Sequence, residues 1–512
     1  MLRKTALAAL LLGALIPAAA GAQAPQTLII NPAAARDTIS RHIYGQFMEH
    51  LGRGIYDGLW QKDAAGNYQF RQEVVAALKN LNIPNVRWPG GCFADYYFWK
   101  DGIGPRAQRP TIVNNMWGGV TEDNSFGTHE YFQLIELLGT QPMVVGNVGS
   151  GSVHEMAQWW EYINHPGKSP MADLRRQNGR EAPWNVRFWG VGNESWGCGG
   201  NMTPEYYADE FKRYATYLQS YGQVRPIRIA TGPSDSTYSW TEGVMRDAGR
   251  MIDVLDMHYY TVTGDWGRWG SATQFGEREW ATSFRKALRI DTIISRHSAI
   301  MDRYDPRKRV ALMIGEWGMW HDMEPGSTPG FLYQQNTLRD ALIASVHFDI
   351  FHRHADRVRM ANIAQMVNVL QAMILTDGPR MLLTPTYHVF EFYKVHQDAL
   401  ALPLTLDPGT YEFDGQTLPA LSATASRDRQ GRIHIALTNI DPNRGHTVAI
   451  TITGMRPAGV SGRILTAPQM SSHNTFDQPN TVAPRTFTGA RVNGEQIAVE
   501  LPPKSIVALE LR

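Results

Sequence analysis

Cysteine is scarce in this sequence: among 512 residues there are only two, Cys92 and Cys198. Two cysteines are too few for a disulfide scaffold, and this pair lacks the spacing of a structural zinc site. In an oxidising compartment the two thiols can form one bridge if the fold brings them together. The sequence alone leaves that pairing open.

An excess of basic charge is also missing, because 49 lysines and arginines face 48 aspartates and glutamates. The chain therefore carries no electrostatic footprint of a nucleic-acid-binding protein. Hydrophobic residues make up 43% and charged residues 19% of the chain, which excludes a largely disordered protein. Beyond the N-terminus no stretch reaches 18 uninterrupted apolar residues, so we expect neither a membrane span nor a nucleic-acid partner.

The first two dozen residues have the pattern of a targeting segment. Arg3 and Lys4 precede an apolar stretch from Thr5 to Ile16, and small residues follow at 20–24 with A-x-A spacing. The apolar stretch is too short to span a membrane. We interpret residues 1–24 as a signal peptide and expect a secreted or periplasmic protein.

Between residues 40 and 394 short apolar, β-prone segments alternate with segments of helical spacing. Near-continuous apolar runs are typical of parallel strands that are buried on both faces. Eight such runs predict a (β/α)₈ barrel with enlarged loops. A doubly wound open sheet is the alternative, but the chain has neither a G-x-G-x-x-G nor a P-loop motif to favour it. The predicted strands are Ile43–Glu49, Ile83–Pro89, Pro142–Asn147, Val186–Asn193, Ile227–Gly232, Val254–Tyr259, Val310–Glu316 and Val358–Val367.

One predicted helix has clear end signals. Thr203 is a plausible N-cap, Pro204 suits the first helical position, and Gly222 is a stop signal. The aromatic residues between them step by three and four, as expected for a helix with one buried face.

After residue 394 the pattern changes to short runs that alternate apolar and polar residues, punctuated by Gly, Pro and Asn. The runs 433–437, 497–501 and 507–511 predict strands of an antiparallel, jelly-roll-like β-sandwich over residues 395–512. The segment 25–39 contains a further β-prone run, Thr27–Ile30, which we expect to add a strand to this sandwich.

In a (β/α)₈ barrel the working residues gather where the strands end. Glu194 and Glu316 each follow an apolar strand and a glycine, with tryptophan nearby. Cleavage of an acetal needs a proton donor for the leaving oxygen and an anion on the opposite face of the sugar, and two carboxyl groups supply both. A single glutamate at a strand end is more often a solvated surface group, but two at matching ends favour catalysis. Other polar or aromatic residues at the predicted strand ends are Glu49, Arg87, Cys92, Asn193, His258, Tyr260 and Gln365.

Two further sets of residues have competing interpretations. The tryptophans at positions 196, 266, 269, 317 and 320 are candidates for sugar-stacking walls, although half or more of them can be core residues. His347, His352 and His354 suggest a metal cluster, but their spacing does not place them on one helical face. We therefore predict no metal site and no cofactor.

Several motifs resemble those of the glycoside hydrolase family 51 α-L-arabinofuranosidases. They are Gly45–Arg53, Arg87–Asp95, the acid/base-like loop Gly192–Met202, the nucleophile-like strand end Ile314–Trp317, and the segments His354–Val358 and Ala361–Gln365. The resemblance covers most of the barrel in the right order, while the sandwich matches only in architecture and position. It implies a retaining exo-enzyme that releases terminal α-L-arabinofuranosyl residues from arabinan, arabinoxylan or their oligosaccharides.

By position, the resemblance implies that Glu194 is the general acid/base and Glu316 the nucleophile. It also implies that Asn193 and Glu49 bind sugar hydroxyls and that Arg87 and Tyr260 hold Glu316. The resemblance further implies that Gln365 reaches a sugar hydroxyl or Glu49, and that His258 supports the residues that touch the sugar. We add Trp196 and Trp320 to the substrate-binding set as stacking candidates, together with Cys92, which stands where some members carry Asn. A thiol is a weaker hydrogen-bond donor than an amide, and a Cys92–Cys198 bridge across the mouth is the alternative if the Cα atoms lie within ~7 Å.

Three alternatives remain open. A retaining endo-β-glucanase or xylan-active hydrolase can use the same barrel, and an open cleft would favour it over a closed cup. A non-catalytic polysaccharide-binding protein is a second possibility, although binding alone does not require the Glu194/Glu316 pair. The family often forms oligomers, so a homo-oligomer is possible.

Overall fold

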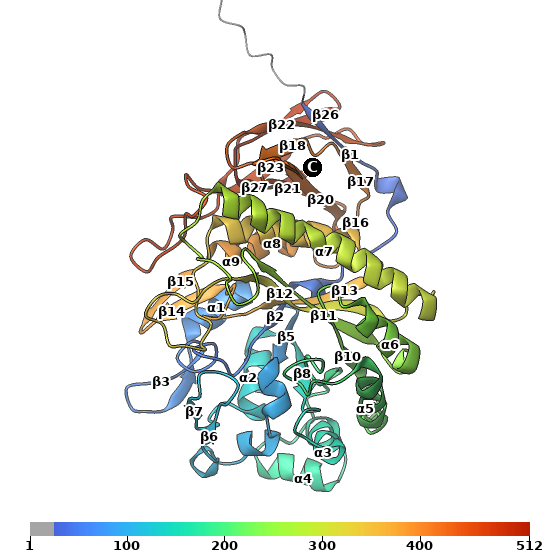
Figure 1. Ribbon diagram of the computed structural model, residues 1–512, viewed down its shortest axis with the longest axis vertical. Helices are drawn as coiled ribbons and strands as arrows, with labels where there is room; N and C mark the ends of the chain where they lie inside the picture. The colour runs from blue at the N-terminus through green and yellow to red at the C-terminus, as the bar shows by residue number, and fades with distance from the viewer. Residues whose placement is uncertain (1–24, 512) are drawn as a thin grey trace, which may run out of the picture.

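The computed structural model describes residues 25–511, which form a barrel and a β-sandwich joined along one side (Figure 1). Eight parallel strands close into the barrel in the order β2-β5-β8-β9-β10-β11-β12-β13, and β13 pairs with β2. The predicted fold class is therefore confirmed, and all eight predicted strands are present. They are β2 (Gly45–Phe47), β5 (Asn85–Trp88), β8 (Gln141–Gly146), β9 (Phe188–Val191), β10 (Ile227–Ser234), β11 (Val254–Val262), β12 (Ala311–Trp320) and β13 (Val358–Ala364).

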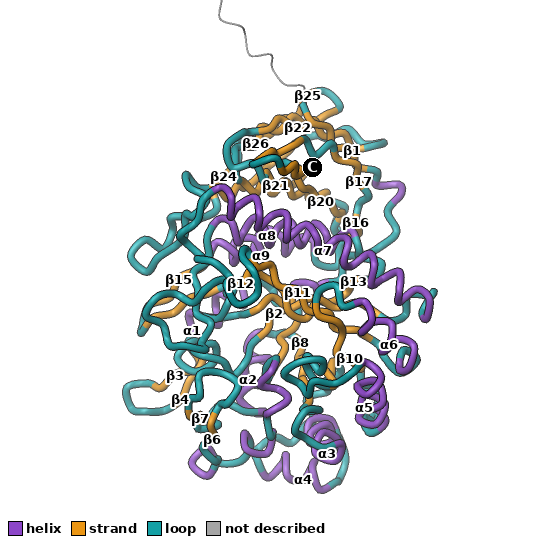
Figure 2. Tube along the Cα trace, in the orientation of Figure 1, coloured by secondary structure: helices purple, strands orange, loops and turns teal. Residues whose placement is uncertain are grey.

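At least one helix follows each barrel strand, so the barrel is surrounded by helices as Figure 2 shows. The helices are α1 (Gln72–Asn80), α2 (Thr128–Leu138), α3 (Val153–Asn164), α4 (Pro170–Gln177), α5 (Pro204–Thr216), α6 (Tyr238–Ala248), α7 (Glu277–Tyr304), α8 (Leu338–Arg353) and α9 (Pro385–Tyr393). Within residues 25–511 no helix is long and apolar enough to cross a membrane.

Several predicted boundaries differ from the structure; β12, for example, continues to Trp320 rather than ending at Glu316. Two of the differences have a clear physical cause. The first barrel strand begins at Gly45 rather than Ile43, because Ser40 caps a short 3-10 helix, η2 (Arg41–Tyr44), by accepting a hydrogen bond from the His42 amide. Helix α5 does begin after the Thr203 cap, but it ends at Thr216, six residues before Gly222. Its expected last turn is instead a tight turn in which the backbones of Tyr221 and Val224 exchange hydrogen bonds.

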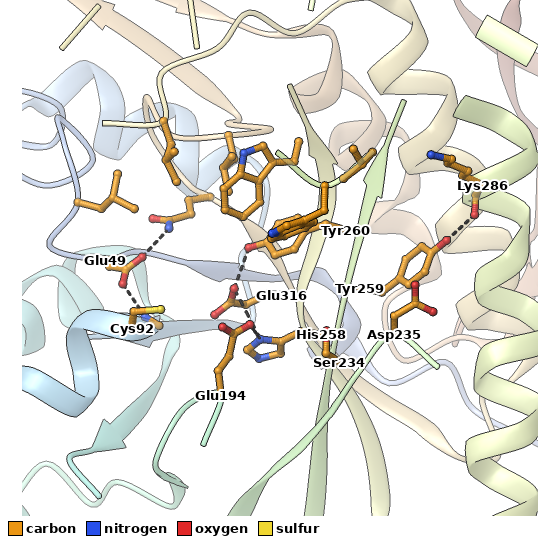
Figure 3. A pocket seen from close by; sticks show the side chains of 18 of the residues that line it. Glu49, Cys92, Glu194, Ser234, Asp235, His258, Tyr259, Tyr260, Lys286 and Glu316 are labelled. Carbon is orange, nitrogen blue, oxygen red and sulfur yellow. Dashed lines mark hydrogen bonds and ion pairs between the residues drawn. The ribbon is translucent and has the colours of Figure 1, made fainter. Parts of the chain in front are cut away.

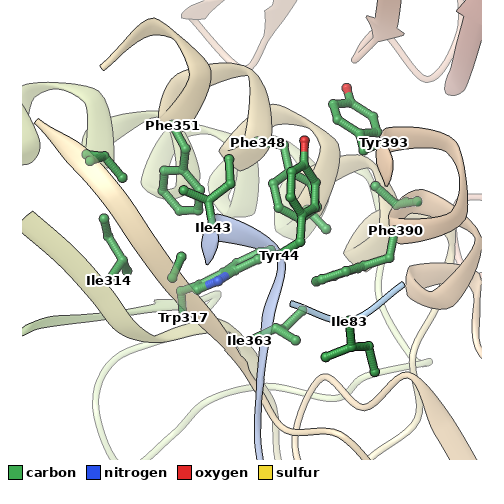
Figure 4. Packing of buried hydrophobic residues seen from close by; sticks show 14 of the residues in the cluster. Ile43, Tyr44, Ile83, Ile314, Trp317, Phe348, Phe351, Ile363, Phe390 and Tyr393 are labelled. Atoms are coloured by element: carbon green, nitrogen blue, oxygen red, sulfur yellow. The ribbon is translucent and has the colours of Figure 1, made fainter. Parts of the chain in front are cut away.

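A cluster of buried aromatic side chains packs between strand β12 of the barrel and the helices α8 and α9 (Figure 4). Trp317 on β12 points outward from the barrel, is fully buried, and lies against Phe348 and Phe351 of α8 and Phe390 of α9. Trp317 is therefore a packing residue and not a sugar-stacking wall. The core fixes the strand that carries Glu316, its neighbour in sequence.

The sandwich consists of two sheets. β1 lies between β17, with which it pairs antiparallel, and β22, with which it pairs parallel. The five-stranded sheet is β17 (Leu404–Leu406), β1 (Gln26–Ile30), β22 (His446–Ile452), β26 (Gln496–Leu501) and β25 (Ala490–Asn493). The six-stranded sheet is β16 (Leu400–Ala401), β20 (Leu421–Arg427), β21 (Ile433–Asn439), β27 (Ser505–Leu511), β23 (Val460–Thr466) and β24 (Arg485–Thr486). We propose that the boundary between the barrel and the sandwich lies between residues 394 and 395.

Short hairpins and 3-10 helices complete the described chain. The hairpins are β3 (Trp60–Lys62) with β4 (Tyr68–Phe70), β6 (Ile112–Val113) with β7 (Thr121–Glu122), β14 (Ile374–Asp377) with β15 (Arg380–Leu383), and β18 (Thr410–Phe413) with β19 (Gln416–Pro419). The remaining 3-10 helices are η1 (Pro32–Ala34), η3 (Cys92–Tyr96), η4 (Trp99–Gly102), η5 (Arg106–Gln108) and η6 (Lys394–His396).

Helix α8 joins the two domains. Ser345 lies 2.7 Å from Thr438, and Ser422 donates to Asp349 at 2.6 Å. His352 contacts Thr424 at 2.8 Å and Tyr44 at 2.7 Å. These buried polar contacts fix the sandwich against the helix whose opposite side packs on β12.

The three histidines of the suspected metal cluster have separate surroundings. His347 is buried among aromatic rings, His352 lies at the domain interface, and His354 pairs with Asp291. In the part of the chain that the structure describes, these histidines do not form one group of potential metal ligands.

Candidate active site

A cavity of about 620 Å³ opens at the carboxyl ends of the barrel strands (Figure 3). Ten of the residues singled out in the sequence line it: Glu49, Cys92, Glu194, Trp196, His258, Tyr260, Trp266, Glu316, Trp320 and Gln365. Arg87 and Asn193 lie directly behind this lining and contact it. The structure thus brings these candidates together, whereas Trp317 packs against α8 and α9.

Glu316 lies on β12 with its side chain 8% exposed. Its Oε1 accepts a hydrogen bond from Arg87 Nη1 at 2.8 Å, and its Oε2 accepts one from the Tyr260 hydroxyl at 2.7 Å. The Gly91 backbone passes so close that an added Cβ would lie 2.7 Å from Oε1. The carboxylate charge is therefore compensated by a guanidinium, and its position is fixed from two sides.

Arg87 connects Glu316 to the loop that carries Glu194. The Arg87 side chain is buried, lies over the Phe47 ring at 4.4 Å, and also donates to the Gly315 carbonyl at 3.0 Å. Its second terminal nitrogen donates to Asn193 Oδ1. Asn193 is buried, and its Nδ2 group lies 3.9 Å from Cys198 Sγ.

Glu194 follows β9 and has a backbone φ of +41°, in the left-handed region that few residues other than glycine occupy. Its Oε1 lies 2.8 Å from His258 Nδ1. Burial raises the pKa of Glu194, the His258 hydrogen bond opposes that rise, and the charge of Glu316 adds to it. A carboxyl group whose pKa is raised in this way can hold a proton for a leaving group.

His258 lies between the two carboxylates. Burial alone would lower its pKa, but the charges of Glu316 and Asp256 and the hydrogen bonds to Asp256 and Glu194 raise it to about 10. The imidazole is therefore a cation at neutral pH. Glu194, His258 and Glu316 offer three potential metal-ligand atoms within 4.8 Å of one another, but a metal ion there would have to displace the His258 proton.

Carboxylate oxygens of Glu194 and Glu316 lie within 4.8 Å of each other, and Figure 3 shows the two side chains pointing toward one another. Retaining glycosidases have carboxyl groups about 5–5.5 Å apart, whereas inverting enzymes need about 6.5–9.5 Å to admit a water molecule. The observed separation matches direct attack on the sugar by one of the two groups.

Glu49 is a third carboxyl group that lines the cavity. Its Oε1 accepts hydrogen bonds from the amides of Gly91 (3.0 Å) and Phe93 (3.1 Å) and from Trp117 Nε1 (2.9 Å). Its Oε2 accepts one from Gln365 Nε2 at 3.0 Å. Burial, followed by the charge of Glu316, raises the pKa of Glu49 to about 7 against these donors.

Sequence reasoning missed two residues of the site, Trp117 and Asp95. Asp95 accepts hydrogen bonds from the amides of Val148 (2.7 Å), Gly149 (2.8 Å) and Asn193 (2.8 Å), so it ties the loops after β5, β8 and β9 together. Burial raises its pKa to about 7, although these three amides oppose the rise. Trp117 lies in a turn and Asp95 in the short 3-10 helix η3, where the period of a strand gives no signal. Asp95 is part of the Arg87–Asp95 motif, but its role was not predicted.

The structure settles the alternatives for Cys92. Cys92 and Cys198 form a disulfide with an S–S distance of 2.11 Å and a Cα–Cα distance of 5.5 Å. The prediction of Cys92 as a thiol donor to substrate is therefore wrong for this state, because a disulfide sulfur carries no proton.

Aromatic side chains form the outer part of the cavity. Trp320 packs between Tyr260 and the pair Trp266 and Trp269, with its ring parallel to that of Trp269. Trp196 is anchored by its indole nitrogen, which donates to the Gly232 carbonyl at 3.0 Å. Both predicted tryptophans thus present a fixed ring at the cavity.

Comparison with known proteins gives one consistent result. Residues 77–288 match the family model described as "Alpha-L-arabinofuranosidase 1 domain", and residues 315–505 match "Alpha-L-arabinofuranosidase C-terminal domain". The chain is 50% identical over 495 residues to a Bacteroides ovatus protein named "Intracellular exo-alpha-L-arabinofuranosidase", with 96% of each chain covered.

Solved structures agree. The chain is similar to the GH51 arabinofuranosidase from Xanthomonas axonopodis pv. citri, with a TM-score of 0.94, 52% identity, and 95% and 100% of the two chains covered. It is also similar to the α-L-arabinofuranosidase from Thermotoga maritima in its arabinose complex, with a TM-score of 0.81, 29% identity, and 95% and 99% coverage.

The comparison corrects one prediction. The Bacteroides ovatus relative is named an intracellular enzyme, and this finding overturns the expectation of a secreted or periplasmic protein. The predicted signal peptide, residues 1–24, lies outside the described residues.

The two family models together span most of the chain, and the relatives match it over nearly its whole length. The chain belongs to the α-L-arabinofuranosidases of glycoside hydrolase family 51.

Proposed function

We propose that this enzyme removes terminal α-L-arabinofuranosyl residues with Glu194 as general acid/base and Glu316 as nucleophile. In the first step Glu316 attacks the anomeric carbon while Glu194 protonates the departing oxygen, which leaves an arabinosyl–Glu316 ester. In the second step Glu194 takes a proton from water, and the water oxygen displaces Glu316. Two inversions at one carbon retain its configuration.

The observation that carries this proposal is the contrast between two carboxylates within 4.8 Å of each other. Glu316 is fixed by a guanidinium and a phenol, which suits a nucleophile that must stay charged and aimed. Glu194 is buried with a raised pKa, which suits a group that must carry a proton in the first step. The assignment of roles follows from this difference.

The other site residues would bind the sugar or hold the pair in place. Asn193 and Glu49 offer a donor and an acceptor for sugar hydroxyls, and Gln365 aims Glu49. Arg87 and Tyr260 position Glu316, and His258 balances the charge between the carboxylates. Trp196 and Trp320 form apolar faces against which a sugar ring can stack.

We infer that the substrates are arabinose-bearing polysaccharides and oligosaccharides such as arabinan or arabinoxylan. The cavity of about 620 Å³ has room for a terminal furanose and for neighbouring sugar units. The chain also shares its fold with a bifunctional glucanase-xylanase at 13% identity, and that likeness concerns the fold alone. A homo-oligomer remains a prediction, which light scattering after size-exclusion chromatography tests.

Two variants and azide test the roles. Glu316→Ala should abolish turnover of aryl α-L-arabinofuranosides, and azide should restore a product of inverted configuration. Glu194→Ala should slow substrates with poor leaving groups about 10²–10⁴-fold more than activated aryl ones. Activity that survives Glu316→Ala, or equal losses for both substrate types in Glu194→Ala, would refute the assignment.

A further inference from the structure

The disulfide lies inside the active site. Cys92 opens η3 after β5, whereas Cys198 lies in the turn after β9, so the bridge crosses over the end of β8 and closes 106 residues of chain. Cys92 lines the cavity, and neither cysteine is fully buried. Cys92 therefore borders the space that a small reductant would enter.

Each end of the bridge carries part of the proposed machinery. On one side, the amides next to Cys92, those of Gly91 and Phe93, hold Glu49. On the other side, the amides of Gly197 and Gly199, which flank Cys198, both donate to the Glu194 carbonyl, at 2.7 and 3.2 Å. The bridge thus ties the turn around Glu194 to the loop that positions Glu49.

The bridge also contacts the Glu194 carboxyl directly. Cys198 Sγ lies 3.6 Å from Glu194 Oε2. His258 contacts the other carboxylate oxygen, Oε1. The bridged sulfur has no proton to donate, so it limits the position of this oxygen without stabilising its charge. Glu194 has a left-handed backbone, which depends on the surrounding turn to persist.

We propose that the Cys92–Cys198 disulfide is a positioning element for the acid/base, so that its reduction weakens the protonation of the leaving group. The proposal rests on the role of Glu194 given above. Reduction by a dithiol breaks the Sγ–Sγ bond and adds two electrons and two protons, giving two thiols, while the dithiol becomes a cyclic disulfide. The freed Cys198 thiol then faces Glu194 Oε2 as a hydrogen-bond donor.

Two measurable effects follow from reduction. The turn after β9 loses its covalent anchor, so Glu194 is aimed less well at the leaving oxygen. The new S–H donor favours the ionised carboxylate, so the basic limb of the pH profile of kcat/KM moves to lower pH. If the bridge only stabilised the fold, its reduction would lower the Tm without changing either the leaving-group dependence or the pH profile.

The test uses the full chain, treated with dithiothreitol and monitored by alkylation and intact mass. We expect kcat/KM for an alkyl α-L-arabinofuranoside to fall about tenfold, because general acid catalysis contributes about 10²–10⁴-fold and is only partly lost. The value for a dinitrophenyl arabinofuranoside should fall less than about twofold. Reoxidation should restore both values, and the double variant Cys92→Ser/Cys198→Ser should behave like the reduced enzyme and ignore dithiothreitol.

The proposal fails if fully reduced enzyme keeps the leaving-group dependence and pH profile of the oxidised enzyme, or if both substrates slow equally. If native enzyme resists dithiothreitol, the double variant decides by the same criteria. Failure here is distinct from failure of the acid/base assignment, because Glu194→Ala tests that assignment in oxidised enzyme. A normal leaving-group effect in Glu194→Ala, with none on reduction, would refute the role of the disulfide alone.

Discussion

Replacing His258 with glutamine removes a positive charge from between the two carboxylates and keeps a neutral donor near Glu194. His258 Nδ1 lies 2.8 Å from Glu194 and 3.7 Å from Glu316, and its pKa of about 10 makes it a cation in the working pH range. Loss of this cation disfavours the ionised form of Glu194. The pKa of Glu194 should therefore rise further above its ordinary value.

The size of this rise can be bounded from the geometry. Two unit charges about 4 Å apart in an effective dielectric near 20 interact by about 4 kcal/mol, or about three pKa units. The Glu194 side chain is 19% exposed, which weakens the interaction. We therefore expect a rise of about one to two units.

The assay is the pH profile of kcat/KM with an aryl arabinofuranoside. The first step requires protonated Glu194, so a raised pKa moves the basic limb of the profile up by about one to two pH units. At neutral pH the second step, which needs Glu194 as a base, should slow, and the glycosyl-enzyme should accumulate with a lower KM. Tyr260→Phe is the matched control, since it removes a hydrogen bond to Glu316 without removing a charge. A basic limb that stays in place, or moves down, in His258→Gln would refute the reasoning.

Two further predictions concern buried groups. Glu49→Gln should lower kcat/KM about 100-fold. All four hydrogen-bond partners of the Glu49 carboxylate are donors, so the amide nitrogen of glutamine would meet another donor. A loss below about threefold, in a variant with unchanged Tm, would contradict this prediction. Burial lowers the pKa of His352 at the domain interface to about 3. Between pH 6.5 and pH 3, therefore, His352 is protonated in the unfolded chain but neutral in the folded protein. The stability present above pH 6.5 should then be lost as the pH falls toward 3, by up to about 5 kcal/mol from this group. Urea unfolding at pH 7 and pH 5 measures the loss, which should be smaller in His352→Gln; an equal loss in both proteins would exclude His352 as the cause.

The barrel strands could be predicted because burial on both faces leaves an apolar run that survives in the sequence. Once eight such runs are placed, barrel geometry brings their ends together, so Glu194 and Glu316 could be paired from opposite sides. The end of helix α5 could not be predicted in this way. Gly222 allows a stop, but the backbone pairing of Tyr221 with Val224 ends the helix earlier.

Residues in the segments between the barrel strands and the α-helices were the main omission. Asp95 holds three amides from two other loops, and Trp117 reaches Glu49 from a loop 68 positions away. Neither contact leaves a periodic signal, because each depends on how separate loops fold over the mouth. The pairing of Cys92 with Cys198 could not be decided from the sequence for the same reason, since the distance between them is set by tertiary structure.

The central claim is that Glu316 forms a covalent bond to the sugar while Glu194 transfers the proton. Glu194→Ala, mixed with an activated aryl α-L-arabinofuranoside and quenched within the first turnover, should accumulate the ester because its hydrolysis lacks a base. Peptide mass spectrometry should then find one arabinosyl unit on the peptide that contains Glu316. A burst of released phenol without an adduct, or an adduct on any other residue, would contradict the account.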